Sequence, residues 1–149
     1  MTKILFVCHG NICRSPMAEF IMKDIVKKDG REAEFEIRSA ATSTEEIGNP
    51  VYPPAREKLA EHGISCKGKC AVQMTKADYE YYDLIIAMDT NNLRNMKRFV
   101  GDDPENKVSR IMDYAGGGDV ADPWYTGDFE MTWNDIYNGC TGLYNKLHR

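Results

Sequence analysis

No stretch of the sequence approaches the roughly 18 consecutive apolar residues that a membrane-spanning helix needs. The apolar run near the start, residues 4–8, is also too short for the core of a signal peptide. Basic residues are the minority, 19 against 23 acidic ones, so the net charge is −4 and a basic footprint for nucleic acid is missing. These absences predict a cytoplasmic protein that binds neither membranes nor nucleic acid.

The sequence also has no linker, internal repeat or low-complexity tract, and its 149 residues leave little room for a second domain. We therefore expect one domain over residues 1–149. The five cysteines are an odd number, and a chain of this length needs no disulfide to be stable. Reduced thiols are the expected state.

Short apolar runs alternate with segments of helical periodicity along the whole chain. This pattern predicts an α/β fold: a four-stranded, parallel, twisted sheet with helices on both faces. Ligands of such sheets bind at the carboxyl ends of the strands. The predicted strands are 3–7, 34–39, 83–88 and 107–112. The predicted helices are 15–28 (N-cap Ser15), 54–61, 90–99 (N-cap Thr90) and 129–147, the last interrupted by Gly139 and Gly142.

The segment 8–16 joins the first predicted strand to the first predicted helix, and it contains the spacing Cys-x5-Arg between Cys8 and Arg14. A loop in this place can aim successive backbone N–H groups at one anion. Gly10 permits close approach of the backbone, and Asn11 tolerates a left-handed conformation. The Arg14 guanidinium matches two oxygens of a phosphate. The segment therefore predicts a phosphate site.

The same electrostatic field favours the thiolate of Cys8, because thiols at helix N-termini are more acidic than free cysteine. Ser15 can donate its hydroxyl to that thiolate. Together these residues predict a nucleophile beneath a phosphate cradle. For the Cys-x5-Arg spacing alone, a buried inert cysteine and a solvated arginine remain the alternative.

The run Cys8-His9-Gly10-Asn11-Ile12-Cys13-Arg14-Ser15-Pro16 closely resembles the active-site loop of the low-molecular-weight protein tyrosine phosphatases. The resemblance implies a four-stranded parallel sheet flanked by helices. It also implies hydrolysis of phosphotyrosine through a phosphocysteine intermediate, without metal or other cofactor, and with inorganic phosphate as product. Further matches are Arg38-Ser39-Ala40-Ala41, His62-Gly63-Ile64, Met88-Asp89 with Asn92-Leu93-Arg94, and Asp122-Pro123-Trp124-Tyr125.

The departing phenolate needs a proton, which a carboxylic acid must supply. The chain has two Asp-Pro pairs, and Asp103 lies in a polar turn that we expect to be solvated. Asp122 precedes Trp124 and Tyr125, which we expect to form an aromatic wall of the substrate pocket. The family places its general acid in this motif, so the resemblance selects Asp122.

Two further sites follow from the resemblance. Asn11 and Ser39 are similar to family residues that form hydrogen bonds beneath the loop, although Ser39 is equally compatible with an ordinary strand-end serine. In relatives, the equivalent of Cys13 forms a disulfide with the nucleophile on oxidation; a packed thiol is the alternative.

The chain departs from the family in two places. Many relatives carry a histidine in the stretch that corresponds to residues 66–70, whereas this chain has Lys67 and Lys69 there. We expect both lysines to be surface charges, or else to attract an anionic substrate. The rim of the pocket, residues 42–48, contains Glu45 and Glu46, which should repel acidic peptides.

Three other functions share some of these features. A thiol-dependent arsenate reductase needs two further redox cysteines near the third strand, but the chain has Met88 and Asp89 there. Phosphoarginine phosphatases carry threonine in place of Ile12. A non-catalytic phosphotyrosine-binding module has no need for Cys8 together with Asp122. We therefore expect a monomeric tyrosine phosphatase that acts on phosphotyrosine-bearing proteins or peptides.

Overall fold

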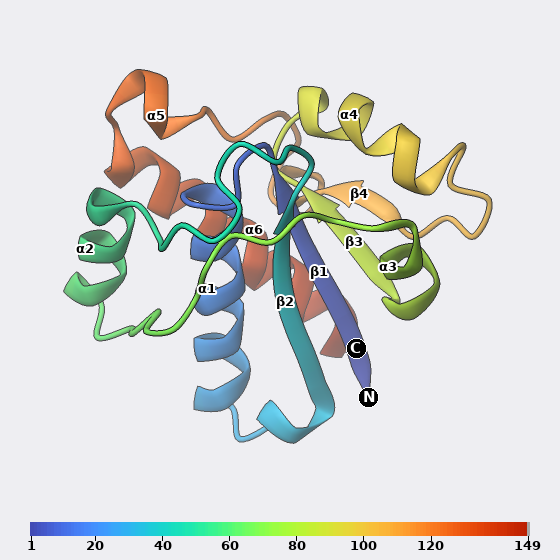
Figure 1. Cartoon of the computed structure of the whole chain (residues 1–149). Coiled ribbons are helices and arrows are strands. Elements are labelled where there is room, and N and C mark those ends of the chain that lie inside the picture. The colour runs from blue at the N-terminus through green and yellow to red at the C-terminus, as the bar shows by residue number, and fades with distance from the viewer. Residues whose placement is uncertain (149) are drawn as a thin grey trace.

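The computed structural model describes residues 1–148, and Figure 1 shows the arrangement of its elements. The strands are β1 (Thr2–Cys8), β2 (Phe35–Ala41), β3 (Leu84–Ala87) and β4 (Val108–Arg110). The helices are α1 (Arg14–Lys28), α2 (Pro53–Glu61), α3 (Lys76–Tyr81), α4 (Thr90–Val100), α5 (Pro123–Thr126) and α6 (Phe129–His148), with 3-10 turns η1 (Glu32–Glu34) and η2 (Ile111–Tyr114).

The four strands form one parallel sheet in the order β2-β1-β3-β4. Its register aligns the carboxyl ends of the strands, since Cys8 pairs with Ala41, and Val7 with Ala87. These ends lie at the top of the sheet in Figure 1, beside the β1–α1 loop and α5. The predicted fold class, a four-stranded parallel α/β sheet, is confirmed.

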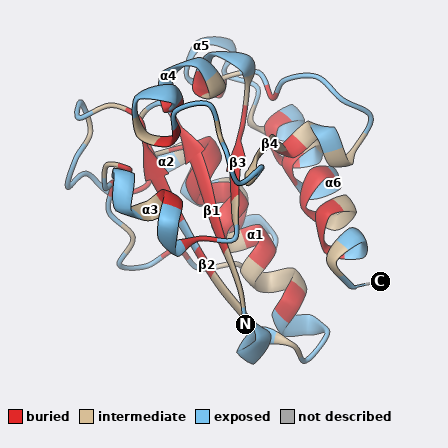
Figure 2. Cartoon of the chain, turned by 90° about the vertical axis from the view of Figure 1, so that its right-hand side faces the viewer, coloured by how far each residue is buried: buried red, intermediate tan, exposed pale blue. Residues whose placement is uncertain are grey.

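Strand β1 is apolar from Ile4 onwards because both faces of this part of the strand are buried, as the red colour of the central strands in Figure 2 shows. Ile4 and Phe6 pack into a core shared with α1, α2 and α6. Leu5 and Val7 pack into a second core under α3 and α4. The two cores fix β1 from both sides, so the loop after Cys8 starts from a rigid support.

Both predicted N-caps were wrong. Helix α1 begins at Arg14, and the Ser15 hydroxyl is within hydrogen-bond distance of Cys8 and Asn11 instead of capping the helix. Helix α4 is capped by Asp89, whose carboxylate accepts a hydrogen bond from the Asn92 N–H at 2.7 Å. A carboxylate satisfies this end better than a threonine hydroxyl, because it also complements the helix dipole.

One strand is shorter than predicted, and two helices were not predicted. The fourth strand ends at Arg110, where the chain turns into η2. Helices α3 and α5 were missed, although each has a start signal: Thr75 with Asp78 forms a capping box, and Asp122 caps a helix with proline at its first position. No helix within residues 1–148 combines the length and the apolarity needed to cross a bilayer.

Helix α6 runs continuously through Gly139 and Gly142, so the final helix predicted over residues 129–147 is confirmed. The glycines lie where α6 packs against η2. An added Cβ at Gly139 would lie 2.9 Å from the Ile111 carbonyl oxygen, and one at Gly142 would overlap the Tyr114 carbonyl oxygen. Both glycines are therefore needed for close packing of the helix.

Gly142→Ala is expected to destabilise the fold by about 2–3 kcal/mol, because the new methyl group meets backbone atoms that cannot rotate away. In an unconstrained helix the same change stabilises by about 1 kcal/mol, so the sign of the effect is diagnostic. Urea unfolding of Gly142→Ala and of the exposed control Asn138→Ala measures it. Equal stability of the two variants would contradict the packing argument.

Candidate active site

The β1–α1 loop encloses the sulfur of Cys8, whose residue is only 3% exposed. The Asn11 N–H donates to Cys8 Sγ at 3.3 Å, and Ser15 Oγ lies 2.9 Å from the same sulfur. When Cys8 is a thiolate, the hydroxyl must be the donor of the second bond. In that state the sulfur accepts hydrogen bonds from both groups.

Asn11 holds the loop in shape from beneath. Its backbone has a φ of 59°, the left-handed region predicted for it, and the residue is buried. Its side-chain amide donates to Ser15 Oγ at 2.7 Å and to Ser39 Oγ at 3.0 Å, and its Oδ1 accepts from the Val72 N–H at 3.1 Å. Ser39 therefore lies beneath the loop, next to Asn11, as the resemblance implied. These three bonds offset the strain of the left-handed backbone.

Arg14 is fixed by groups from two distant parts of the chain. Its Nη1 donates to Asp89 Oδ2 at 2.6 Å and to the Val120 carbonyl oxygen at 2.8 Å. Burial lowers the pKa of Arg14, but Cys8, Asp89 and Asp122 outweigh this effect and raise it above its ordinary value. The guanidinium is thus charged and oriented before any ligand arrives. Sequence reasoning missed the role of Asp89, although its place just after β3 puts it at the carboxyl end of the sheet.

Asp122 lies at the N-terminus of α5, where its Oδ1 accepts from the Trp124 N–H at 3.0 Å. Its Oδ2 is 3.5 Å from Arg14 Nη2, and its side chain is partly exposed. The other Asp-Pro aspartate, Asp103, is more than a solvated turn, because it accepts a hydrogen bond from the Tyr79 hydroxyl at 2.7 Å. The structure therefore brings Asp122, and not Asp103, to the loop of Cys8.

Cys8, Arg14 and Asp122 line one cavity of about 240 Å³ at the carboxyl end of the sheet. The loop residues predicted to bind phosphate form its floor: His9, Gly10, Asn11, Ile12, Cys13 and Arg14. Its rim consists of Glu45, Glu46, Asp122, Trp124 and Tyr125. The predicted pocket residues are thus brought together in space.

The rim is both aromatic and acidic. Trp124 packs against Tyr52 with ring centroids 4.9 Å apart, and Tyr125 is 85% exposed. Glu45 Oε2 lies 3.0 Å from His9 Nε2, so one of the two rim glutamates has a partner inside the loop. An aromatic ring that enters the pocket would meet Trp124 on one side.

The expectation that Lys69 is a surface charge was wrong. Its side chain is 11% exposed, and its Nζ donates to the Ser39 carbonyl oxygen at 2.9 Å. The same Nζ lies 3.6 Å from Oε1 of Glu19, a buried carboxylate that the sequence analysis also overlooked. Lys67, by contrast, is exposed as expected.

Cys13 lies in the same loop as Cys8, and both are free thiols. Burial, together with the negative charges of Cys8 and Asp122 and against the positive charge of Arg14, raises the pKa of the Cys13 thiol from 9.0 to about 12. The folded chain therefore holds this proton more tightly than the unfolded chain. Its contribution to stability is complete below pH 9 and is lost as the pH rises towards 12.

The free energy of unfolding is accordingly expected to fall above pH 9, and to fall less steeply in Cys13→Ala. Urea unfolding below and within this alkaline window gives the two slopes. Comparing the proteins isolates Cys13 from the tyrosines that titrate in the same range. Identical slopes would show that Cys13 does not hold its proton more tightly in the folded chain.

Comparison with known proteins agrees with this geometry. The family model described as low molecular weight phosphotyrosine protein phosphatase matches residues 3–149. The chain is 39% identical to the low molecular weight protein-tyrosine-phosphatase YfkJ of Bacillus subtilis, across 100% of this chain and 97% of YfkJ. It is 42% identical to the low molecular weight phosphotyrosine protein phosphatase of Schizosaccharomyces pombe, across 85% of each chain.

Solved structures extend the comparison. The crystal structure of YfkJ matches with a TM-score of 0.96 and covers 99% of this chain and 95% of its own. The crystal structure of a Drosophila arginine phosphatase matches with a TM-score of 0.89 at 27% identity, over 99% of each chain. The full-length match in sequence, and the match of the whole fold, show that this chain belongs to the low molecular weight protein-tyrosine-phosphatase family.

Proposed function

We propose that this phosphatase hydrolyses protein phosphotyrosine without a metal, through a phosphocysteine intermediate, with Cys8 as nucleophile and Asp122 as general acid. One observation carries the proposal: Cys8, Arg14 and Asp122 line the same small cavity, whose rim includes Trp124. A nucleophile, a phosphate clamp, a proton donor and an aromatic wall are the groups that this reaction needs.

In the first step the Cys8 thiolate attacks phosphorus in line with the bond to the tyrosine oxygen. Arg14 and the backbone N–H groups of residues 9–14 hold the three equatorial oxygens. An S–P bond forms as the P–O bond breaks, and the Asp122 carboxylic acid gives its proton to the departing phenolate. The products are tyrosine and phosphocysteine.

In the second step water attacks the phosphocysteine. The Asp122 carboxylate takes one proton from the water as the new P–O bond forms and the S–P bond breaks. Inorganic phosphate leaves and the Cys8 thiolate is restored. Ser15 and the Asn11 N–H, which lie 2.9 Å and 3.3 Å from the sulfur, stabilise the thiolate as leaving group.

The substrate assignment depends on the pocket, because a relative named as an arginine phosphatase has the same fold. Here Ile12 in the loop and Trp124 and Tyr125 on the rim offer apolar contact to a phenyl ring. The carboxylates of Glu45 and Glu46 beside them disfavour acidic peptides. Phosphotyrosine in a neutral or basic sequence is the expected substrate.

The test is turnover of a phosphotyrosine peptide, with phosphoarginine and arsenate as parallel substrates, in the presence of reductant and chelator. We expect phosphotyrosine to be preferred and chelation to have no effect. Acid quenching during turnover should trap a phosphate on Cys8, which peptide mass spectrometry locates. A preference for phosphoarginine would overturn the substrate class and leave the loop chemistry in place.

A further inference from the structure

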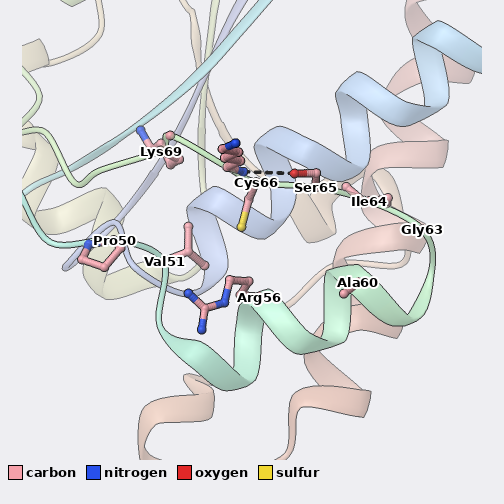
Figure 3. Close-up of a pocket in the computed structure, with 11 residues that line it drawn as sticks. Pro50, Val51, Arg56, Ala60, Gly63, Ile64, Ser65, Cys66 and Lys69 are labelled. Carbon is pink, nitrogen blue, oxygen red and sulfur yellow. Dashed lines mark hydrogen bonds between the residues drawn. The ribbon is translucent and has the colours of Figure 1, made fainter.

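Lys69 lies between the surface and the active-site loop. A cavity of about 510 Å³ separates α2 from the segment that carries Cys66 and Lys69, and Figure 3 shows Lys69 at its edge. The Lys69 side chain points away from this cavity, towards β2, where its Nζ donates to the Ser39 carbonyl oxygen. The Lys69 ammonium group therefore forms its hydrogen bond in the interior of the protein and not in the cavity.

A chain of hydrogen bonds links this point to the sulfur. Ser39 Oγ donates to Glu19 Oε1 at 2.5 Å, and it accepts from the Asn11 amide at 3.0 Å. The same amide donates to Ser15 Oγ at 2.7 Å, which lies 2.9 Å from Cys8 Sγ. The amide thus donates in both directions, and each direction ends on an anion, Glu19 at one end and the Cys8 thiolate at the other.

Glu19, at one end of this hydrogen-bond chain, needs a positive charge nearby. Its side chain is 3% exposed, and an uncompensated buried carboxylate is very costly. Lys23 Nζ binds its Oε2 at 2.5 Å from the more exposed side, and Lys69 lies beside Oε1, the oxygen that receives the Ser39 hydroxyl. Lys69 therefore holds the Glu19 carboxylate, the end of the hydrogen-bond chain, on the side nearest the active-site loop.

The charges are coupled as well. Burial lowers the pKa of Lys69, whereas attraction to Glu19 and to the Cys8 thiolate opposes that effect, and Lys23 adds a repulsion. The Cys8 thiolate thus favours the ammonium form of Lys69. Two cations and one carboxylate leave a net positive charge behind the loop.

We infer that Lys69 is a positioning residue for the phosphatase reaction: with Glu19 it holds Ser39, and through Ser39 and Asn11 it keeps the Cys8 thiolate in its reactive geometry. This inference rests on the proposed function of Cys8 as nucleophile. It does not place Lys69 in contact with substrate.

The test compares Lys69→Gln, which removes the charge and keeps a donor, with Lys69→Arg, which keeps the charge. Lys67→Gln is the matched control, because Lys67 lies two residues away on the exposed side of the same segment. For Lys69→Gln we expect kcat to fall about tenfold with KM changed much less. The rate of Cys8 alkylation by iodoacetate, located by peptide mass spectrometry, should shift to higher pH by about one unit. Lys69→Arg should recover most of both effects.

Alkylation reports on the thiolate without any substrate, so it separates the two proposals. If wild type fails to hydrolyse phosphotyrosine but Lys69→Gln still shifts the alkylation profile, the reaction is misassigned and the role of Lys69 holds. Wild-type kcat and alkylation in Lys69→Gln would overturn the inference. If Lys69→Gln folds poorly, Ser39→Ala tests the next hydrogen bond of the chain and must shift the alkylation profile in the same way. An unshifted profile in Ser39→Ala would also overturn the inference.

Discussion

Cys8→Ser is expected to abolish turnover of phosphotyrosine, with a fall of at least about 10⁴-fold in kcat. The loop surrounds the sulfur with donors that favour a thiolate, whereas a serine hydroxyl at the same place stays protonated. Arg14, Asp89 and the backbone N–H groups are untouched, so the phosphate cradle remains. The variant should therefore bind a phosphotyrosine peptide about as tightly as the wild type, and calorimetric titration measures this.

Cys70→Ser is the matched control, since Cys70 is an exposed thiol away from the loop. It should keep wild-type turnover. Cys8→Ser should also yield no trapped phosphoprotein on acid quenching. Residual turnover above about a thousandth of wild type would contradict nucleophilic catalysis by Cys8.

Asp122→Asn is expected to slow hydrolysis of phosphotyrosine by about 10²–10⁴-fold, the usual contribution of a general acid. The amide still accepts the Trp124 N–H, so the start of α5 should stay in place. The loss should depend on the leaving group, because an acidic phenol departs without a proton, whereas tyrosine, with a pKa of about 10, needs one. A series of aryl phosphates with leaving phenols of increasing acidity measures this dependence.

Asp103→Asn is the control for this series, because Asp103 belongs to the other Asp-Pro pair. Its carboxylate accepts from the Tyr79 hydroxyl and from the Lys107 and Val108 N–H groups. Its replacement should lower the free energy of unfolding and leave the leaving-group dependence unchanged. A uniform loss across all leaving groups in Asp122→Asn would exclude Asp122 as the proton donor.

The sequence was most informative where local signals coincide. The apolar run, the loop with Asn11 and the helical pattern after it predicted β1, the loop and α1. They placed Cys8 at the end of a strand and Arg14 next to the start of a helix. The pattern could not reveal which groups orient Arg14. Its partners Asp89 and Val120 are 75 and 106 residues away, and only the order of strands in the sheet brings them together.

The role of Lys69 could not be predicted from the local sequence either. Its neighbours in sequence, Lys67 and Gly68, predict an exposed polar turn, and Lys67 fits that prediction. Whether a lysine two residues further on points outwards or inwards depends on the buried carboxylate of Glu19, which belongs to α1. The interior partner, and not the local pattern, decides which lysine is structural.

The long distances in sequence between Arg14 and its partners affect when the site can form during synthesis. During synthesis, residues 8–15 leave the ribosome early, but Asp89, Val120 and Asp122 follow only much later. Until then the guanidinium has none of these three partners, and α1 lacks the apolar cover of α6. With the roles proposed for Arg14 and Asp122, enzymatic competence is therefore one of the last properties the nascent chain acquires, even though Cys8, the proposed nucleophile, is among the first residues translated.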